Sequence, residues 1–182
     1  MAKQIYQLKI TLEGIRPPLW RRVLVDGATP LGKLHRIFQI VMGWHNSHLH
    51  AFRIGYENYG EPDPNFDDDY MEDERKVKLQ AIAPEAGAKF HYEYDFGDSW
   101  SHLVQVEKII APEPGTVYPL CIKGKRACPP EDCGGVWGYA DLLDALSNPA
   151  HEEHEEMLEW VEDDFDPEAF DQNAVNNFLR QI

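Results

Sequence analysis

The segment from Leu31 to Met42 constrains the fold more than any other stretch of the chain. Its apolar residues recur at intervals of three and four, which predicts a helix with one apolar face. Thr29 and Pro30 before it are typical of a helix start, and Gly43 after it is typical of a helix end. Because such a helix must cover an apolar surface, its neighbours in the chain decide the architecture.

Strands are expected on both sides of this helix. Residues Tyr6 to Leu12 alternate between apolar and polar, and Trp20 to Val25 follow after a turn with two prolines, which predicts a hairpin. Further strands are expected at Leu49 to Ile54, at Phe90 to Phe96 and at Trp100 to Ile110. We therefore predict an α+β fold with a mostly antiparallel sheet and a β-grasp-like start of hairpin and helix.

The last part of the chain predicts helices at residues 139–147, 149–162 and 171–182. Residues 141–182 contain thirteen acidic side chains and one basic one, whereas residues 1–36 contain seven basic and two acidic ones. The acidic helices are expected either to form a solvated surface or to dock beside the basic N-terminal strands.

The order of the elements indicates how the chain is organised. Residues 1–115 form a strand-rich half, residues 116–138 an irregular segment, and residues 139–182 a helical part. Within the first half, residues 56–74 predict a solvated loop that contains three consecutive aspartates. Because there is no internal repeat and no low-complexity tract, we expect a single domain over residues 1–182.

The charge argues against one broad class of function. The 182 residues include 32 acidic and 17 basic side chains, for a net charge of −15. Such a field repels phosphate backbones, so a nucleic-acid partner is not expected. The sequence lacks a membrane-spanning apolar stretch and a signal-peptide run, and three cysteines without such a signal fit a reducing compartment. We expect a soluble cytoplasmic protein.

The first candidate site follows the predicted helix and contains Trp44, His48 and His50. On a strand, residues two apart project from the same face, so the two histidines could bind a metal ion together. The alternative is that both lie on a polar face of the sheet and bond to their neighbours.

The second candidate site surrounds a hairpin turn and contains Asp95, Asp98, Trp100 and His102. Two carboxylates and an imidazole are the groups of a divalent-metal site or of acid–base catalysis. The alternative is a structural turn, in which Asp98 caps the hairpin and Trp100 fills the core.

The third candidate site lies in the irregular segment and contains Cys121, Cys128 and Cys133, with Glu131 and Asp132 between the last two. Three thiolates and one histidine can bind zinc, and His102 would be the fourth ligand. The spacing has no pair of cysteines two residues apart, so we expect three reduced thiols packed in the loop instead.

The three candidate sites could meet in one ligand pocket. If their strands are neighbours in the sheet, the histidines and carboxylates come within reach of one ligand, and the loop from Glu131 to Gly135 closes over them. A divalent metal such as zinc would then bind to His48, His50, Asp95 and His102. The expected pocket is lined by Trp44, His48, His50, Asp95, Asp98, Trp100, His102, Glu131 and Asp132, with Trp137 at its rim.

Several short strings together resemble a known family. They are PLWRR from Pro18, LH from Leu34, GW from Gly43, HLHAF from His48, YDFGDSWSH from Tyr94 and PPEDCGG from Pro129. The chain resembles the plasmid pRi ORF-three-like family, also labelled insertion-element passenger proteins of the TnpR type, from about Tyr6 to the C-terminus. The resemblance implies a single α+β domain without an established biochemical activity.

The resolvase label suggests recombination, but the residues argue against it. A recombinase needs several arginines on the scissile phosphate and a basic DNA-binding surface, whereas the C-terminal helices here are acidic. We therefore reject recombinase activity. We favour a non-enzymatic interaction or accessory module that binds a protein partner. The alternative is a metal-dependent, hydrolase-like enzyme with Asp98 or His102 as its acid–base group.

Overall fold

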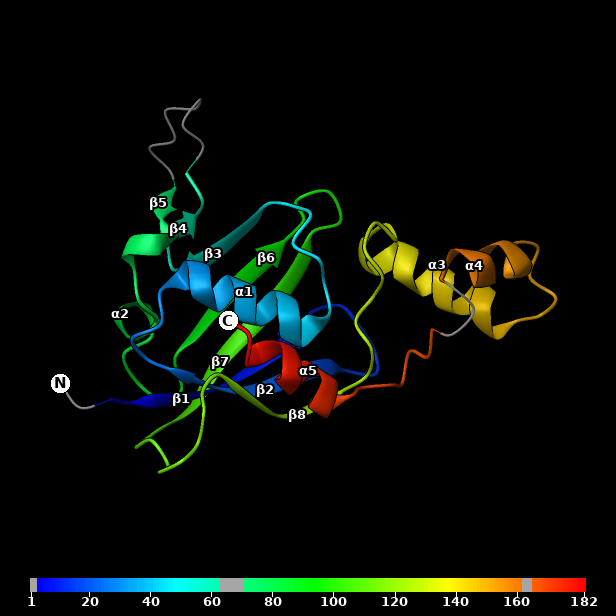
Figure 1. Ribbon diagram of the computed structural model, residues 1–182. Helices are drawn as coiled ribbons and strands as arrows, with labels where there is room; N and C mark the ends of the chain where they lie inside the picture. The colour runs from blue at the N-terminus through cyan, green and yellow to red at the C-terminus, as the bar shows by residue number, and fades with distance from the viewer. Residues whose placement is uncertain (1–2, 63–70, 162–164) are drawn as a thin grey trace.

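One mixed sheet organises the computed structural model, which describes residues 3–62, 71–161 and 165–182 (Figure 1). The strands are β1 (Ile5–Leu12), β2 (Leu19–Asp26), β3 (His50–Ile54), β4 (Glu57–Gly60), β5 (Glu72–Asp73), β6 (Lys89–Tyr94), β7 (Trp100–Ile110) and β8 (Leu120–Lys125). Their order is β5-β4-β3-β6-β7-β1-β2-β8, and all neighbours are antiparallel except β4 and β5. The predicted α+β fold with a mostly antiparallel sheet is confirmed.

The helices are α1 (Leu31–Met42), α2 (Leu79–Ile82), α3 (Gly135–Ser147), α4 (His154–Trp160) and α5 (Gln172–Leu179), and a 3-10 turn spans Glu74–Lys76. Helix α1 crosses one face of the sheet, and α5 packs beside it and against β8 (Figure 1). Helices α3 and α4 pack on each other beyond the end of the sheet. None of the helices in the described ranges is long and apolar enough to cross a membrane.

Helix α1 covers the sheet with the apolar face that its sequence predicts. Leu34, Ile37 and Phe38 have no exposed surface, because they lie against side chains of the central strands. The helix ends at Gly43, which has a φ of 99° and donates its N–H to the carbonyl of Gln39 at 2.8 Å. A positive φ of this kind is the conformation in which glycine has an advantage over other residues.

The predicted hairpin of β1 and β2 is present, and β1 also pairs antiparallel with β7 along its whole length. The β-grasp-like arrangement that the sequence predicts is therefore found in the hairpin of β1 and β2 and in helix α1 after it. The central position of β1 explains its burial pattern, since Leu8, Ile10 and Leu12 are covered on the α1 side of the sheet.

Two segments that the sequence predicts as irregular contain strands. Residues 56–74 contribute β4 and β5 at one edge of the sheet, whereas the run Asp67-Asp68-Asp69 lies outside the described residues. Residues 116–138 contain β8, which pairs with β2 at the other edge. These strands form because a neighbouring strand offers unpaired backbone N–H and C=O groups. Such pairing between distant segments is not visible in the local sequence pattern.

The helical part also differs in its boundaries. Helix α3 begins at Gly135 instead of Tyr139, because Gly134 and Gly135 adopt positive φ angles and turn the chain into the helix. Helices α4 and α5 are shorter than the predicted segments 149–162 and 171–182.

The burial of Leu34 gives a direct test of this packing. Replacing Leu34 by Ala is expected to lower the free energy of unfolding by about 2–5 kcal/mol, because it opens a cavity under α1. The exposed neighbour Lys33 provides the control, and Lys33→Ala is expected to change stability by less than about 0.5 kcal/mol. Urea denaturation measures both. Equal, small effects would mean that this face of α1 is not core.

Candidate functional site

A histidine and three carboxylates meet beside the turn between β6 and β7. The Nε2 atom of His48 lies 3.1 Å from Oδ1 of Asp132, 3.4 Å from Oε2 of Glu131 and 3.6 Å from Oδ2 of Asp95. None of these three contacts has the geometry of a hydrogen bond, so this buried nitrogen has no hydrogen-bond partner among the described residues. We call these four residues the His48 cluster.

The position of Asp95 is fixed by the tight turn that it begins. Its φ is 57°, a conformation that aspartate tolerates better than most residues, and its Oδ1 accepts the N–H of Gly97 at 2.9 Å. Its own N–H donates to the carbonyl of Leu49 at 2.8 Å, which ties the turn to the loop that contains His48. Oδ1 of Asp95 therefore accepts the hydrogen bond that closes the turn, and Oδ2 faces His48.

Glu131 is held in place by groups from two other segments. Its Oε1 accepts the backbone N–H of His45 at 2.6 Å, and the hydroxyl of Tyr94 lies 3.1 Å from both carboxylate oxygens. Burial raises the pKa of Tyr94 to about 12, so the hydroxyl stays protonated and donates. Asp132, by contrast, has a side chain that is 71% exposed, and it forms the solvent side of the cluster.

Asp98 has a different task from Asp95. Its Oδ2 accepts the N–H of Gly134 at 3.1 Å, at the start of α3. Gly135 fits here because a Cβ atom on it would lie 2.5 Å from the carbonyl oxygen of Asp98. Asp98 thus joins the hairpin turn to the beginning of α3, where it fixes the loop that contains Glu131 and Asp132.

His50 lies away from the His48 cluster. Strand β3 begins at His50, so His48 belongs to the preceding loop and the rule of alternating faces does not apply to the pair. The Nε2 atom of His50 is 2.7 Å from Oε2 of Glu74, and its ring stacks on His35 with 3.4 Å between the ring centres. The grouping of His48 with His50 as metal ligands is therefore not the arrangement found.

His102 is also separate, and it is completely buried. Its Nδ1 lies 3.1 Å from the carbonyl oxygen of Tyr92, and its ring meets the ring of Trp44 edge-on. Burial lowers the pKa of His102 to about 4, so the side chain is neutral at pH 7. Trp100, another expected pocket residue, is 1% exposed and belongs to the core.

His35 is a polar core residue that the sequence analysis missed. Its two ring nitrogens lie 2.8 Å from the hydroxyl of Tyr92 and 2.5 Å from Oδ1 of Asn46, and Gln39 donates to the same tyrosine hydroxyl. Burial lowers the pKa of His35 to about 3. The available signal was its position on the apolar face of α1, one residue after Leu34.

The three cysteines are free thiols. Cys121 lies in β8, and burial raises its pKa and that of Cys128, and raises the pKa of Cys133 to about 12. In residues 3–62, 71–161 and 165–182, the group of three potential metal ligands within 4.8 Å of one another consists of His48, Asp95 and Asp132. A site built from the three cysteines is therefore not the arrangement found among these residues.

A groove of about 570 Å³ adjoins the His48 cluster and shares Glu131 with it. Trp44 lines the groove and is fixed there by a hydrogen bond from its Nε1 to the carbonyl of Pro129 at 3.1 Å. Trp160 in α4 also lines the groove and is 45% exposed. Trp137, which we expected at the rim of the ligand pocket, is 83% exposed and is not among the residues that line this groove.

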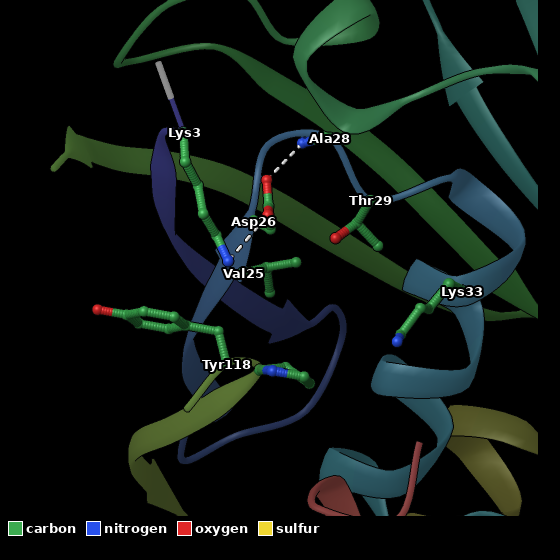
Figure 2. Close-up of a pocket in the computed structure, with 8 residues that line it drawn as sticks. Lys3, Val25, Asp26, Ala28, Thr29, Lys33 and Tyr118 are labelled. Carbon is green, nitrogen blue, oxygen red and sulfur yellow. Dashed lines mark hydrogen bonds and ion pairs between the residues drawn. The ribbon is translucent and has the colours of Figure 1, made fainter. Parts of the chain in front are cut away.

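A second cavity of about 190 Å³ lies between β2, α1 and the segment at Tyr118 (Figure 2). Asp26 in this cavity accepts the N–H of Ala28 at 2.8 Å and pairs with Lys3 at 3.3 Å. Figure 2 shows that Lys33 enters from α1 on the other side. Because the carboxylate of Asp26 already has these two partners, this cavity is a weaker candidate than the His48 cluster.

The buried histidines predict how stability depends on pH. A histidine in the unfolded chain has a pKa near 6.5, whereas His102 in the folded protein has a pKa of about 4. The unfolded state therefore takes up the proton first, and stability present above pH 6.5 is lost as the pH falls toward 4, by about 1.4 kcal/mol per pH unit for this group. Urea denaturation from pH 7 to pH 4.5 measures the slope.

A His102→Phe variant is the matched control, because it removes the titrating group and keeps an aromatic ring. Its stability is expected to depend less steeply on pH than that of the wild type. Equal slopes in the two proteins would contradict the assignment of a neutral, buried His102.

Comparisons with known proteins support the fold and the resemblance to a family that the sequence indicated. Residues 4–174 match the family model described as plasmid pRiA4b ORF-3-like protein. The uncharacterized protein y4hQ of Sinorhizobium fredii (strain NBRC 101917 / NGR234) is 41% identical over 184 residues, which cover 100% of this chain and 94% of that protein.

Among solved structures, the chain is similar to the protein of unknown function MM3350 from Methanosarcina mazei Go1. The TM-score is 0.86 and the sequence identity 38%, and the match covers 94% of this chain and 97% of the other. Neither relative's description states an activity, so a function has to be argued from the site.

Proposed function

Because this chain belongs to the plasmid pRiA4b ORF-3-like family, whose two relatives above are described without an activity, we propose a function from its own site. The protein is a cytoplasmic interaction or accessory module that binds a divalent transition-metal ion. The ion is held by Nε2 of His48 and by carboxylate oxygens of Asp95 and Asp132, with Glu131 beside them.

The geometry around Nε2 of His48 carries this proposal. Ligand atoms bound to an ion at about 2.1 Å lie roughly 3.0–3.4 Å from one another. The three carboxylate oxygens lie 3.1, 3.4 and 3.6 Å from the nitrogen. A buried imidazole nitrogen without a hydrogen bond loses free energy unless it gains a partner, and an ion between these atoms would be that partner.

Charge supports the same conclusion. The cluster contains three carboxylates, and no lysine or arginine in the described ranges forms an ion pair with any of them. A divalent cation would offset this excess negative charge. One imidazole combined with carboxylates suits zinc, manganese or iron, whereas calcium and magnesium prefer oxygen ligands alone.

The surroundings of the cluster support an interaction role. Leu49 and Phe96, the residues after His48 and Asp95, are 68% and 47% exposed. Trp137 in the first turn of α3 is 83% exposed. Large apolar side chains that stay in water next to a polar site are typical of a surface that a protein partner covers. The three free cysteines fit a reducing compartment, and we treat residues 1–182 as one domain.

Asp132 provides the most selective test, because its exposed side chain serves no packing role. Asp132→Asn is expected to weaken the binding of Zn²⁺ or Mn²⁺ by about tenfold or more, since a neutral amide is a poorer ligand than a carboxylate. Isothermal titration calorimetry measures the affinity. Asp141→Asn on the exposed side of α3 removes the same charge elsewhere and is expected to leave binding unchanged.

The single variant His48→Gln is expected to lose most of the affinity for Zn²⁺ or Mn²⁺. Its thermal stability without metal is expected to stay near that of the wild type. Added Zn²⁺ should raise the melting temperature of the wild type more than that of either cluster variant, because the ion stabilises only the folded state in proportion to its affinity. Equal titration curves for the wild type and both cluster variants would contradict the proposal.

A further inference from the structure

Arg21 in β2 is a buried cation at the edge of the groove that adjoins the His48 cluster. It is 1% exposed and is one of the residues that line the groove. Its Nε donates to the carbonyl of Val41 at 2.6 Å, and its Nη1 donates to the carbonyls of Trp20 and Lys125 at 3.0 and 2.9 Å. Nη2 donates to no acceptor in residues 3–62, 71–161 or 165–182.

The charge of Arg21 is not balanced by an acidic group in that part of the chain. Its guanidinium lies 4.2 Å from the centre of the Phe170 ring, and no described carboxylate forms an ion pair with it. The nearby thiols of Cys121 and Cys128 do not supply a negative charge, because burial raises the pKa of both. Buried charges in proteins are usually paired, so an arginine of this kind favours an anion as its partner.

The groove around Arg21 is large and mostly apolar. Its volume of about 570 Å³ falls in the range of small-molecule sites, and its walls include Met42, Trp160, Phe165 and Val175. A ligand that fits these walls has an apolar or aromatic body. Arg21 adds a polar requirement, which is an acceptor for its Nη2.

The two carboxylates that also line the groove already have partners. Glu131 accepts from the N–H of His45, and Oδ1 of Asp171 accepts the N–H groups of Asn173 and Ala174 at 2.9 and 3.0 Å. Neither carboxylate forms an ion pair with Arg21 among the contacts of the described residues.

We propose that this groove binds a carboxylic acid with an apolar or aromatic body, and that the carboxylate of this ligand pairs with Nη2 of Arg21. Guanidinium–carboxylate pairs combine charge with matched hydrogen bonds, which gives selectivity for the acid over a neutral analogue. The inference rests on Arg21 and the groove, and it is independent of a metal ion at the His48 cluster.

The first test compares 3-phenylpropionate with 3-phenylpropanamide, which have the same apolar body and differ in charge. Calorimetry and tryptophan fluorescence report binding, because Trp44 and Trp160 line the groove. The acid is expected to bind at least about tenfold more tightly than the amide. A short peptide that ends in phenylalanine, with a free or an amidated C-terminus, distinguishes a peptide ligand from a free acid.

Variants locate the binding site. Ala174→Phe places a ring in the groove and is expected to abolish binding, whereas Asn173→Phe adds the same ring to an exposed position of α5 and is expected to have no effect. Arg21→Gln is expected to remove the preference for the acid over the amide. If Arg21→Gln does not fold, the Ala174→Phe variant and the comparison of acid with amide still test whether the groove binds a carboxylic acid.

Three results would overturn the inference. They are equal affinity for acid and amide, binding that survives Ala174→Phe, and binding that appears only when Glu162, Asp163 and Asp164 are replaced by amides. These three acidic residues lie outside the described ranges, between the groove residues Val161 and Phe165 in sequence. The last result would mean that the chain itself supplies the anion for Arg21.

Discussion

The turn between β6 and β7 is the constraint on which the rest of the site depends. Asp95 uses one carboxylate oxygen to close this turn and its backbone N–H to hold the loop before β3, which leaves the other oxygen facing His48. Asp98, three residues later, holds the start of α3 and with it the loop of Glu131 and Asp132. Three segments far apart in the sequence are therefore positioned by one short turn. A metal ion at the His48 cluster would join the same three segments a second time.

Much of the fold was predictable, because β1, β2, α1, β6 and β7 have strong periodic patterns and clear turn residues. Strands β4 and β8 were not, since they form by adding to the edges of an existing sheet and their own sequences carry little alternation. The same limit applies at α3, whose first turn depends on glycine conformations and on contact with Asp98. Local sequence specifies these elements only together with their neighbours in space.

The candidate site was predictable in its residue types and less so in its grouping. Asp95, Glu131, Asp132 and His48 do come together, whereas His50 and His102 lie elsewhere. His102 alternates with Trp100, Val104 and Val106, so its place on the buried face of β7 was readable from the pattern. The separation of His48 from His50 was not, because it depends on where β3 begins. The burial of Arg21 was not predictable from the local sequence, because it depends on the packing of Phe170, 149 positions later, over its guanidinium.

The position of a bound ion is the most direct evidence for or against the central claim that His48, Asp95 and Asp132 form a metal site. The decisive measurement is anomalous X-ray diffraction from crystals grown with Mn²⁺ or Zn²⁺, recorded at wavelengths on either side of the metal's absorption edge. We expect one strong anomalous peak about 2.0–2.3 Å from Nε2 of His48 and from an oxygen of each aspartate. A crystal with a strong peak elsewhere, or with His48 bonded directly to a carboxylate and no metal between them, would contradict it.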